Sequence, residues 1–69
     1  MNTDEKLVAQ ANQIAAFFAV QGETRAVPAI ADHIKKFWDP GMRHKFLALL
    51  PAAEPNLHPL VRKAVPLIR

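Results

Sequence analysis

Six prolines divide this chain of 69 residues into short segments. Proline lacks a backbone N–H and fixes φ, so it ends or bends a helix unless it stands in the first turn. The clearest break is the dipeptide Asp39-Pro40. Because a residue before proline avoids helical backbone angles, one helix should end at Trp38, with Asp39 as the N-cap and Pro40 as the first residue of the next. The chain is therefore limited to short elements joined by tight turns.

Hydrophobic spacing predicts that these elements are helices. Apolar residues recur at intervals of three and four, and no alternating strand pattern or internal repeat is present. We expect helices at residues 4–20, 27–38, 40–50 and 59–65. The second should begin near Val27, which places Pro28 in its first turn. We expect an extended linker at residues 51–59, and Pro66 should break the last helix. The predicted fold is all-α: a single domain over residues 1–69, with three bundled helices and a short C-terminal helix.

Composition argues against catalysis by this chain. It has no cysteine, which excludes disulfides, thiolate nucleophiles and cysteine-bearing zinc sites, and it has no serine. His33, His44 and His58 lack the i, i+4 spacing of metal-binding helices. The two glycines do not form a phosphate-binding loop. We therefore expect neither catalytic residues nor a metal site.

No apolar run reaches the length of about 18 residues that a membrane span needs. Residues 1–6 include two acids and lack the basic region of a secretory signal. Together with the absence of cysteine, these features predict a cytoplasmic protein without a membrane partner.

Charge is unevenly distributed along the chain. Residues 1–32 hold two basic and four acidic side chains, whereas residues 33–69 hold seven basic and two acidic ones. The basic half suits a nucleic acid, a phosphate-bearing cofactor, an acidic protein surface, or simply solvent. Three short helices with a sharp turn resemble a helix-turn-helix in outline, with Arg43, His44 and Lys45 on the reading helix. That helix lacks the Asn, Gln or Ser side chains that commonly read base edges, so we expect no nucleic-acid partner. A basic nucleic-acid-binding domain stays as the alternative function.

Two pairs of adjacent aromatic residues favour a protein interface. Phe17-Phe18 occurs in the first expected helix, and Phe37-Trp38 ends the second. Adjacent residues on a helix point about 100° apart, so one member of each pair should lie near the surface unless the bundle covers both. Large aromatic side chains beside basic ones are typical of interface anchors. Whether Trp38 belongs to the core or to the interface stays open at this point.

Three blocks resemble the delta subunit of cytosolic NAD-dependent formate dehydrogenase. They are residues 11–18 (ANQIAAFF), 30–43 (IADHIKKFWDPGMR) and 59–64 (PLVRKA). They follow the family's order and span most of the chain, and the central block is the most specific of the three.

The resemblance implies a non-catalytic small subunit, or an assembly factor, of a formate dehydrogenase complex. In such a complex the catalytic alpha subunit holds bis-molybdopterin guanine dinucleotide (bis-MGD) with molybdenum or tungsten. The complex as a whole also carries iron–sulfur clusters, FMN and NAD. None of these cofactors is expected on this chain alone. The role that the resemblance implies for this chain is to bind the alpha subunit and to support insertion or retention of bis-MGD. The expected partner-binding residues are Phe17, Phe18, Phe37, Trp38, Asp39, Pro40, Met42 and Arg43. Candidate contacts to cofactor phosphates are Lys35, Lys36, Arg43 and Lys45.

Overall fold

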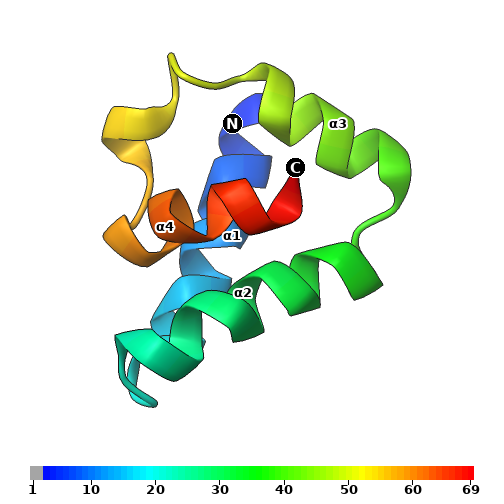
Figure 1. The fold of residues 1–69 in the computed structure, drawn as a ribbon. Coiled ribbons are helices and arrows are strands. Elements are labelled where there is room, and N and C mark those ends of the chain that lie inside the picture. The colour runs from blue at the N-terminus through cyan, green and yellow to red at the C-terminus, as the bar shows by residue number, and fades with distance from the viewer. Residues whose placement is uncertain (1–2) are drawn as a thin grey trace.

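A computed structural model describes residues 3–69, and over that range the chain is helical without a strand. The elements are α1 (Thr3–Ala19), α2 (Glu23–Phe37), α3 (Pro40–Ala48), the 3₁₀ turn η1 (Glu54–Asn56) and α4 (Pro59–Ile68) (Figure 1). The prediction of a small all-α fold is confirmed. Within the described residues, no helix has the length and apolarity to cross a membrane.

The helices pack around a core to which each contributes. α2 packs chiefly on α4 and α1, and both α3 and α4 also contact α1. In the view of Figure 1, α4 crosses the middle of the molecule with α2 below it and α3 above it. The largest fully buried side chains are Ile30 and Ile34 of α2, Phe46 of α3 and Val61 of α4. Buried alanines on α1, α2 and α4 let the helix axes approach closely, because the distance between packed helices depends on side-chain size at the contact.

The corner between α2 and α3 forms as the dipeptide predicts. The Trp38 N–H donates to the Ile34 carbonyl at 3.0 Å, which closes α2 with Trp38 as its C-cap. The Asp39 carboxylate accepts a hydrogen bond from the Met42 N–H at 2.8 Å and so caps α3, whose first residue is Pro40. The stop and restart at this dipeptide is confirmed, although Trp38 lies just beyond the helix rather than within it.

The start of α2 differs from the prediction. The helix begins at Glu23 instead of Val27, and Pro28 lies inside it. The Gly22 carbonyl accepts from the Arg25 and Ala26 N–H groups at 3.2 and 2.8 Å, so the first turn forms without Pro28. Ala26 is fully buried, and burial of this turn against the core outweighs the one hydrogen bond that proline cannot make.

α4 also continues past a proline. The prediction that Pro66 breaks the helix after residue 65, leaving an apolar tail, was wrong, because α4 runs to Ile68. Ile68 is buried in the core, and the Arg69 N–H donates to the Val65 carbonyl at 3.2 Å, across the proline. Packing of Val65 and Ile68 therefore holds the last turn in helical form.

Smaller corrections concern the other expected boundaries. α1 spans residues 3–19 rather than 4–20, and α3 ends at Ala48 rather than at residue 50. Residues 51–59 are not extended: the Ala53 N–H donates to the Leu49 carbonyl at 3.0 Å, and η1 follows. Successive short-range hydrogen bonds thus coil this proline-rich segment.

Candidate partner-binding site

Each aromatic pair has one ring outside the core. Phe17 is 72% exposed, whereas Phe18 is half-buried and packs on the core. Phe37 is also 72% exposed, whereas Trp38 is only 7% exposed. The prediction that one member of each pair lies near the surface is confirmed.

Trp38 is a core residue of this chain. Its indole ring meets the fully buried Phe46 ring edge to face, with centroids 5.4 Å apart and an interplanar angle of 86°. This geometry is a favoured arrangement of aromatic rings. The side chain therefore joins the end of α2 to the middle of α3, and the question that the sequence left open is answered for the isolated chain.

The exposed rings border a groove between α1 and α2, which we call the aromatic groove. Its volume is about 390 Å³. α1 contributes Gln10, Gln13, Ile14, Phe17 and Phe18, and α2 with its C-cap residue contributes His33, Phe37 and Trp38. The groove thus contains the two aromatic pairs that the sequence analysis singled out, and it brings them together from separate helices.

Stacked rings connect the two walls of the aromatic groove. Phe17 and Phe18 meet edge to face at 5.2 Å between centroids, and Phe18 meets His33 at 6.0 Å. His33 in turn lies 4.6 Å from Phe37 in a tilted stack. These ring contacts favour one arrangement of the side chains. Rings that are already partly ordered lose less side-chain entropy on binding than free ones.

Within residues 3–69, no aspartate, glutamate, lysine or arginine lines the aromatic groove. Its polar members are two glutamines and one histidine, which can donate and accept hydrogen bonds at the edge of an apolar floor. An apolar side chain fits such a groove, whereas a charged group would lose hydration without gaining an opposite charge.

The remaining predicted partner-binding residues surround the α2–α3 corner. Asp39 and Pro40 are exposed, but their observed roles are to cap and start α3. Met42 is half-buried against the core. Arg43 turns back to α2, where its Nη1 lies 3.5 Å from the Lys35 carbonyl oxygen at the end of that helix. A guanidinium at this place also interacts favourably with the helix dipole.

The four candidate phosphate contacts do not form one cluster. Lys35 and Lys36 occur in the last turn of α2, and Arg43 reaches the same end of the helix. Lys36 pairs with Asp32 at 3.1 Å, one turn earlier on α2. Lys45 is exposed but follows Arg43 by two positions on α3, which directs the two side chains to different flanks of that helix. Arg43 thus meets the backbone of Lys35 at the end of α2, Lys36 is held toward Asp32, and Lys45 lies apart on α3.

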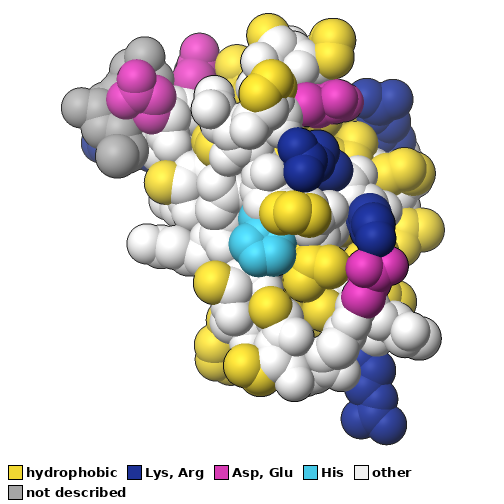
Figure 2. Space-filling view, turned by 90° about the vertical axis from the view of Figure 1, so that its left-hand side faces the viewer, with side chains coloured by type: hydrophobic (Ala, Val, Ile, Leu, Met, Phe, Trp, Pro, Cys, Tyr) yellow, Lys and Arg dark blue, Asp and Glu magenta, His cyan; other side chains and the backbone are white. Residues whose placement is uncertain are grey.

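Exposure of apolar atoms alone does not mark this site. On the face seen in Figure 2, hydrophobic side chains reach the surface in several places between basic and acidic ones. Such scattered exposure is ordinary in small proteins. What distinguishes the aromatic groove is the size of its exposed rings and their continuous stacking.

Two residues of structural importance were missed at the sequence level. His33 was considered only as a metal ligand, yet it lies between Phe18 and Phe37, and its i, i+4 spacing to Phe37 was the available signal. Asn12 joins α1 to the segment before α4: its Nδ2 donates to the Asn56 carbonyl at 2.9 Å, and its Oδ1 accepts from the His58 N–H at 2.8 Å. Its partners are 44 and 46 residues away, so no local pattern indicated them.

Residues 3–69 contain no group of three histidine or acidic side chains placed to hold a metal ion.

The family model for the NADH-dependent formate dehydrogenase delta subunit FdsD matches residues 6–65. The chain belongs to this family. The matched range contains the aromatic groove, the α2–α3 corner and the FdsD-like blocks on which the resemblance rested. No curated protein and no solved structure shows a significant match to this FdsD-family chain.

Proposed function

We propose that this chain is a non-catalytic accessory subunit or assembly factor of the formate dehydrogenase complex, and that it docks on the catalytic alpha subunit through the aromatic groove. Family membership supports the complex. The observation that carries the docking surface is the 72% exposure of both Phe17 and Phe37 on one groove. Large rings held open to water beside a preformed apolar groove are typical of interface anchors.

The anchors of this docking surface differ from those expected from the sequence. Trp38 was among the expected partner-binding residues, but its ring is already in the core beside Phe46. Phe17 and Phe37 take that role, and Trp38 forms part of the wall against which a partner side chain packs.

Support for cofactor insertion or retention would come from the bases at the end of α2. Ammonium and guanidinium groups suit phosphate oxygens, and bis-MGD carries phosphates that such groups can contact when bound. Lys35 and Lys36 are exposed, and Arg43 is half-buried nearby. This donor set fits a surface contact to phosphates. It does not fit an iron–sulfur cluster, because the chain has no cysteine.

The docking surface is tested with the variant F17S/F37S. We expect it to lose co-purification with the alpha subunit while the circular dichroism spectrum and thermal midpoint stay near those of the unmodified chain. The matched control is V20S, because Val20 is 89% exposed but lies outside the aromatic groove. Retained binding of F17S/F37S in a folded state would refute the docking surface.

The cofactor role is tested separately with K35Q/K36Q, compared with K6Q on the exposed part of α1. We expect the alpha subunit to co-purify with K35Q/K36Q but to contain less molybdenum or tungsten, measured by elemental analysis. Unchanged metal content would remove the cofactor role and leave the docking role standing. The ratio of this chain to the alpha subunit in purified active enzyme then separates a permanent subunit from a transient assembly factor.

A further inference from the structure

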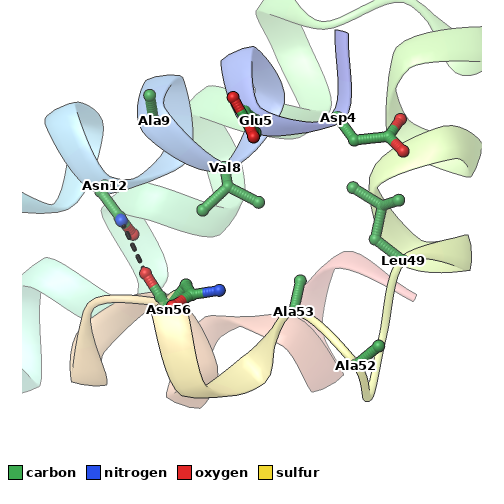
Figure 3. Close-up of a pocket in the computed structure, with 9 residues that line it drawn as sticks. All are labelled: Asp4, Glu5, Val8, Ala9, Asn12, Leu49, Ala52, Ala53 and Asn56. Carbon is green, nitrogen blue, oxygen red and sulfur yellow. Dashed lines mark hydrogen bonds between the residues drawn. The ribbon is translucent and has the colours of Figure 1, made fainter. Parts of the chain in front are cut away.

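A second groove follows the other flank of α1, and we call it the acid-edged groove. Its volume is about 480 Å³. One wall is the first half of α1, and the other is the segment that leads from α3 through η1 (Figure 3). At about 100° per residue, Val8 and Asn12 lie on nearly the opposite side of α1 from Gln13 and Phe17 of the aromatic groove. The two grooves therefore face different directions.

The floor of the acid-edged groove is aliphatic. Val8 and Ala9 contribute from α1, and Leu49, Ala52 and Ala53 contribute from the opposite wall. Figure 3 shows Val8 of α1 and Ala53 of the opposite wall directed into the space between the two walls. An aliphatic side chain of a ligand can fill this space and lose contact with water, which is favourable in proportion to the apolar area removed.

Hydrogen bonds hold the two walls at a fixed distance. The Asn12 side chain bridges them through the Asn56 carbonyl at 2.9 Å (Figure 3), and it also accepts from the His58 N–H at 2.8 Å. The Ala53 N–H to Leu49 carbonyl bond, 3.0 Å, shapes the far wall. The side-chain amide of Asn56 forms no hydrogen bond within residues 3–69, so it can pair with the backbone of a ligand.

The opposite end of this groove carries the exposed carboxylate of Asp4. Asp4 and Glu5 of the first turn of α1 line it. Asp4 is exposed and forms no ion pair with any described residue. The chain as a whole carries a net charge of +3, and the Asp4 carboxylate is an acid exposed at this end of the groove. A ligand that is complementary to this groove has a cation for the Asp4 carboxylate next to an aliphatic group for the floor.

We propose that the acid-edged groove binds a segment of another polypeptide that presents an aliphatic side chain beside a lysine or arginine. The aliphatic side chain fills the floor, the cation lies near Asp4, and the segment's backbone meets the Asn56 amide. This proposal does not depend on the aromatic groove or on its partner. With both grooves occupied, the chain would contact two polypeptide surfaces from opposite flanks of α1.

The test is a titration of the full ¹⁵N-labelled chain, followed by heteronuclear NMR, with the peptide acetyl-Ala-Leu-Arg-Ala-amide. The charge-reversed control is acetyl-Ala-Leu-Glu-Ala-amide. We expect the arginine peptide to shift the amide signals of Val8, Ala9, Ala52 and Ala53, with affinity about twofold to fivefold higher than that of the glutamate peptide, as for an exposed ion pair.

Three variants locate the binding. D4N should remove the preference for the arginine peptide, whereas D32N removes an acid outside the groove and should leave that preference intact. A52W fills the groove from an exposed position and should weaken both peptides without unfolding the chain. No shifts with either peptide, equal affinities for the two, or shifts centred on the aromatic groove would each overturn the proposal. The same signals moving on dilution of the protein alone would identify a second copy as the occupant and also overturn it.

Discussion

Phe37 and Trp38 are neighbours in the chain, yet they have opposite surroundings. Trp38 is 7% exposed and stacks on Phe46, whereas Phe37 is 72% exposed at the edge of the aromatic groove. The turn at Asp39 sets this division, because α2 ends at Phe37 and the extended backbone at Trp38 directs its ring toward α3. One side chain therefore contributes to stability, and its neighbour is available for binding.

Trp38→Ala should lower the free energy of unfolding by about 3–5 kcal/mol, the usual cost of removing a large buried ring. A chain this small has a net stability of only about 3–5 kcal/mol, so we expect this variant to be largely unfolded at room temperature. Phe37→Ala is the matched control and should change stability by less than about 0.5 kcal/mol, as exposed positions usually do. Urea titrations followed by circular dichroism measure both. A stable Trp38→Ala protein would contradict the core role of this ring.

Asn12→Ala should remove two hydrogen bonds between α1 and residues 56–58. Each such bond contributes about 0.5–1.5 kcal/mol, so we expect a loss of about 1–3 kcal/mol. Hydrogen exchange gives a local readout, because the His58 N–H donates to the deleted Oδ1 and should exchange faster. Gln13→Ala, a neighbouring change on the same helix, should leave that amide protected. Unchanged exchange at His58 in Asn12→Ala would show that the bridge is dispensable.

At the scale of elements, α2 and α4 each contain an interior proline. Pro66 cannot donate to the carbonyl one turn earlier, and its ring crowds that carbonyl. The helix persists because Val65 and Ile68 are buried on either side of the proline. Tertiary packing thus outweighs a strong local preference.

Pro66→Ala restores the missing donor and removes the crowding. We expect the free energy of unfolding to rise by up to about 3 kcal/mol, the cost of proline relative to alanine inside a helix. Pro59→Ala is the control: Pro59 is the first residue of α4, where the missing N–H costs nothing, so this change should give no gain. Thermal melts of the two variants compare them directly. A destabilised Pro66→Ala would mean that the native backbone there departs from helical form.

The contrast between these prolines shows how far sequence reasoning reaches. Pro40 and Pro59 begin helices as predicted, because their effects are local. Pro28 and Pro66 were expected to bound helices, but burial of Ala26 and Ile68 by distant elements overrides them. In the candidate site, too, local features were predictable and long-range contacts were not. The aromatic pairs were visible in the sequence, whereas the stacking of His33 across helices and the Asn12 bridge depend on long-range packing.

At the scale of the whole molecule, a chain of 69 residues without disulfides has a small core and a large surface. Its accessible surface is 4321 Å². A standard protein interface covers about 800 Å² on each partner, which would be a large share of that surface. Binding and stability are therefore expected to be strongly linked.

Saturating alpha subunit should raise the thermal midpoint of this chain. A ligand that binds only the folded state at a concentration of about 100 times its dissociation constant adds about 2.7 kcal/mol. In so small a domain we expect a rise of more than 10 °C, since about 1 kcal/mol corresponds to about 4–8 °C. Differential scanning calorimetry of the separate and mixed proteins measures this rise, and F17S/F37S should abolish it. An unchanged midpoint in the mixture would contradict docking of the folded chain.

The position of Trp38 also gives the molecule an intrinsic optical reporter. It is the only tryptophan, and the chain has no tyrosine, so ultraviolet emission comes from this one ring. That ring is buried against Phe46, yet its edge borders the aromatic groove. Unfolding would move the emission to longer wavelength, and a partner seated in the groove would exclude the remaining water and move it to shorter wavelength. With a partner that lacks tryptophan, the emission wavelength of the unlabelled protein can thus distinguish its unfolded, free and bound states.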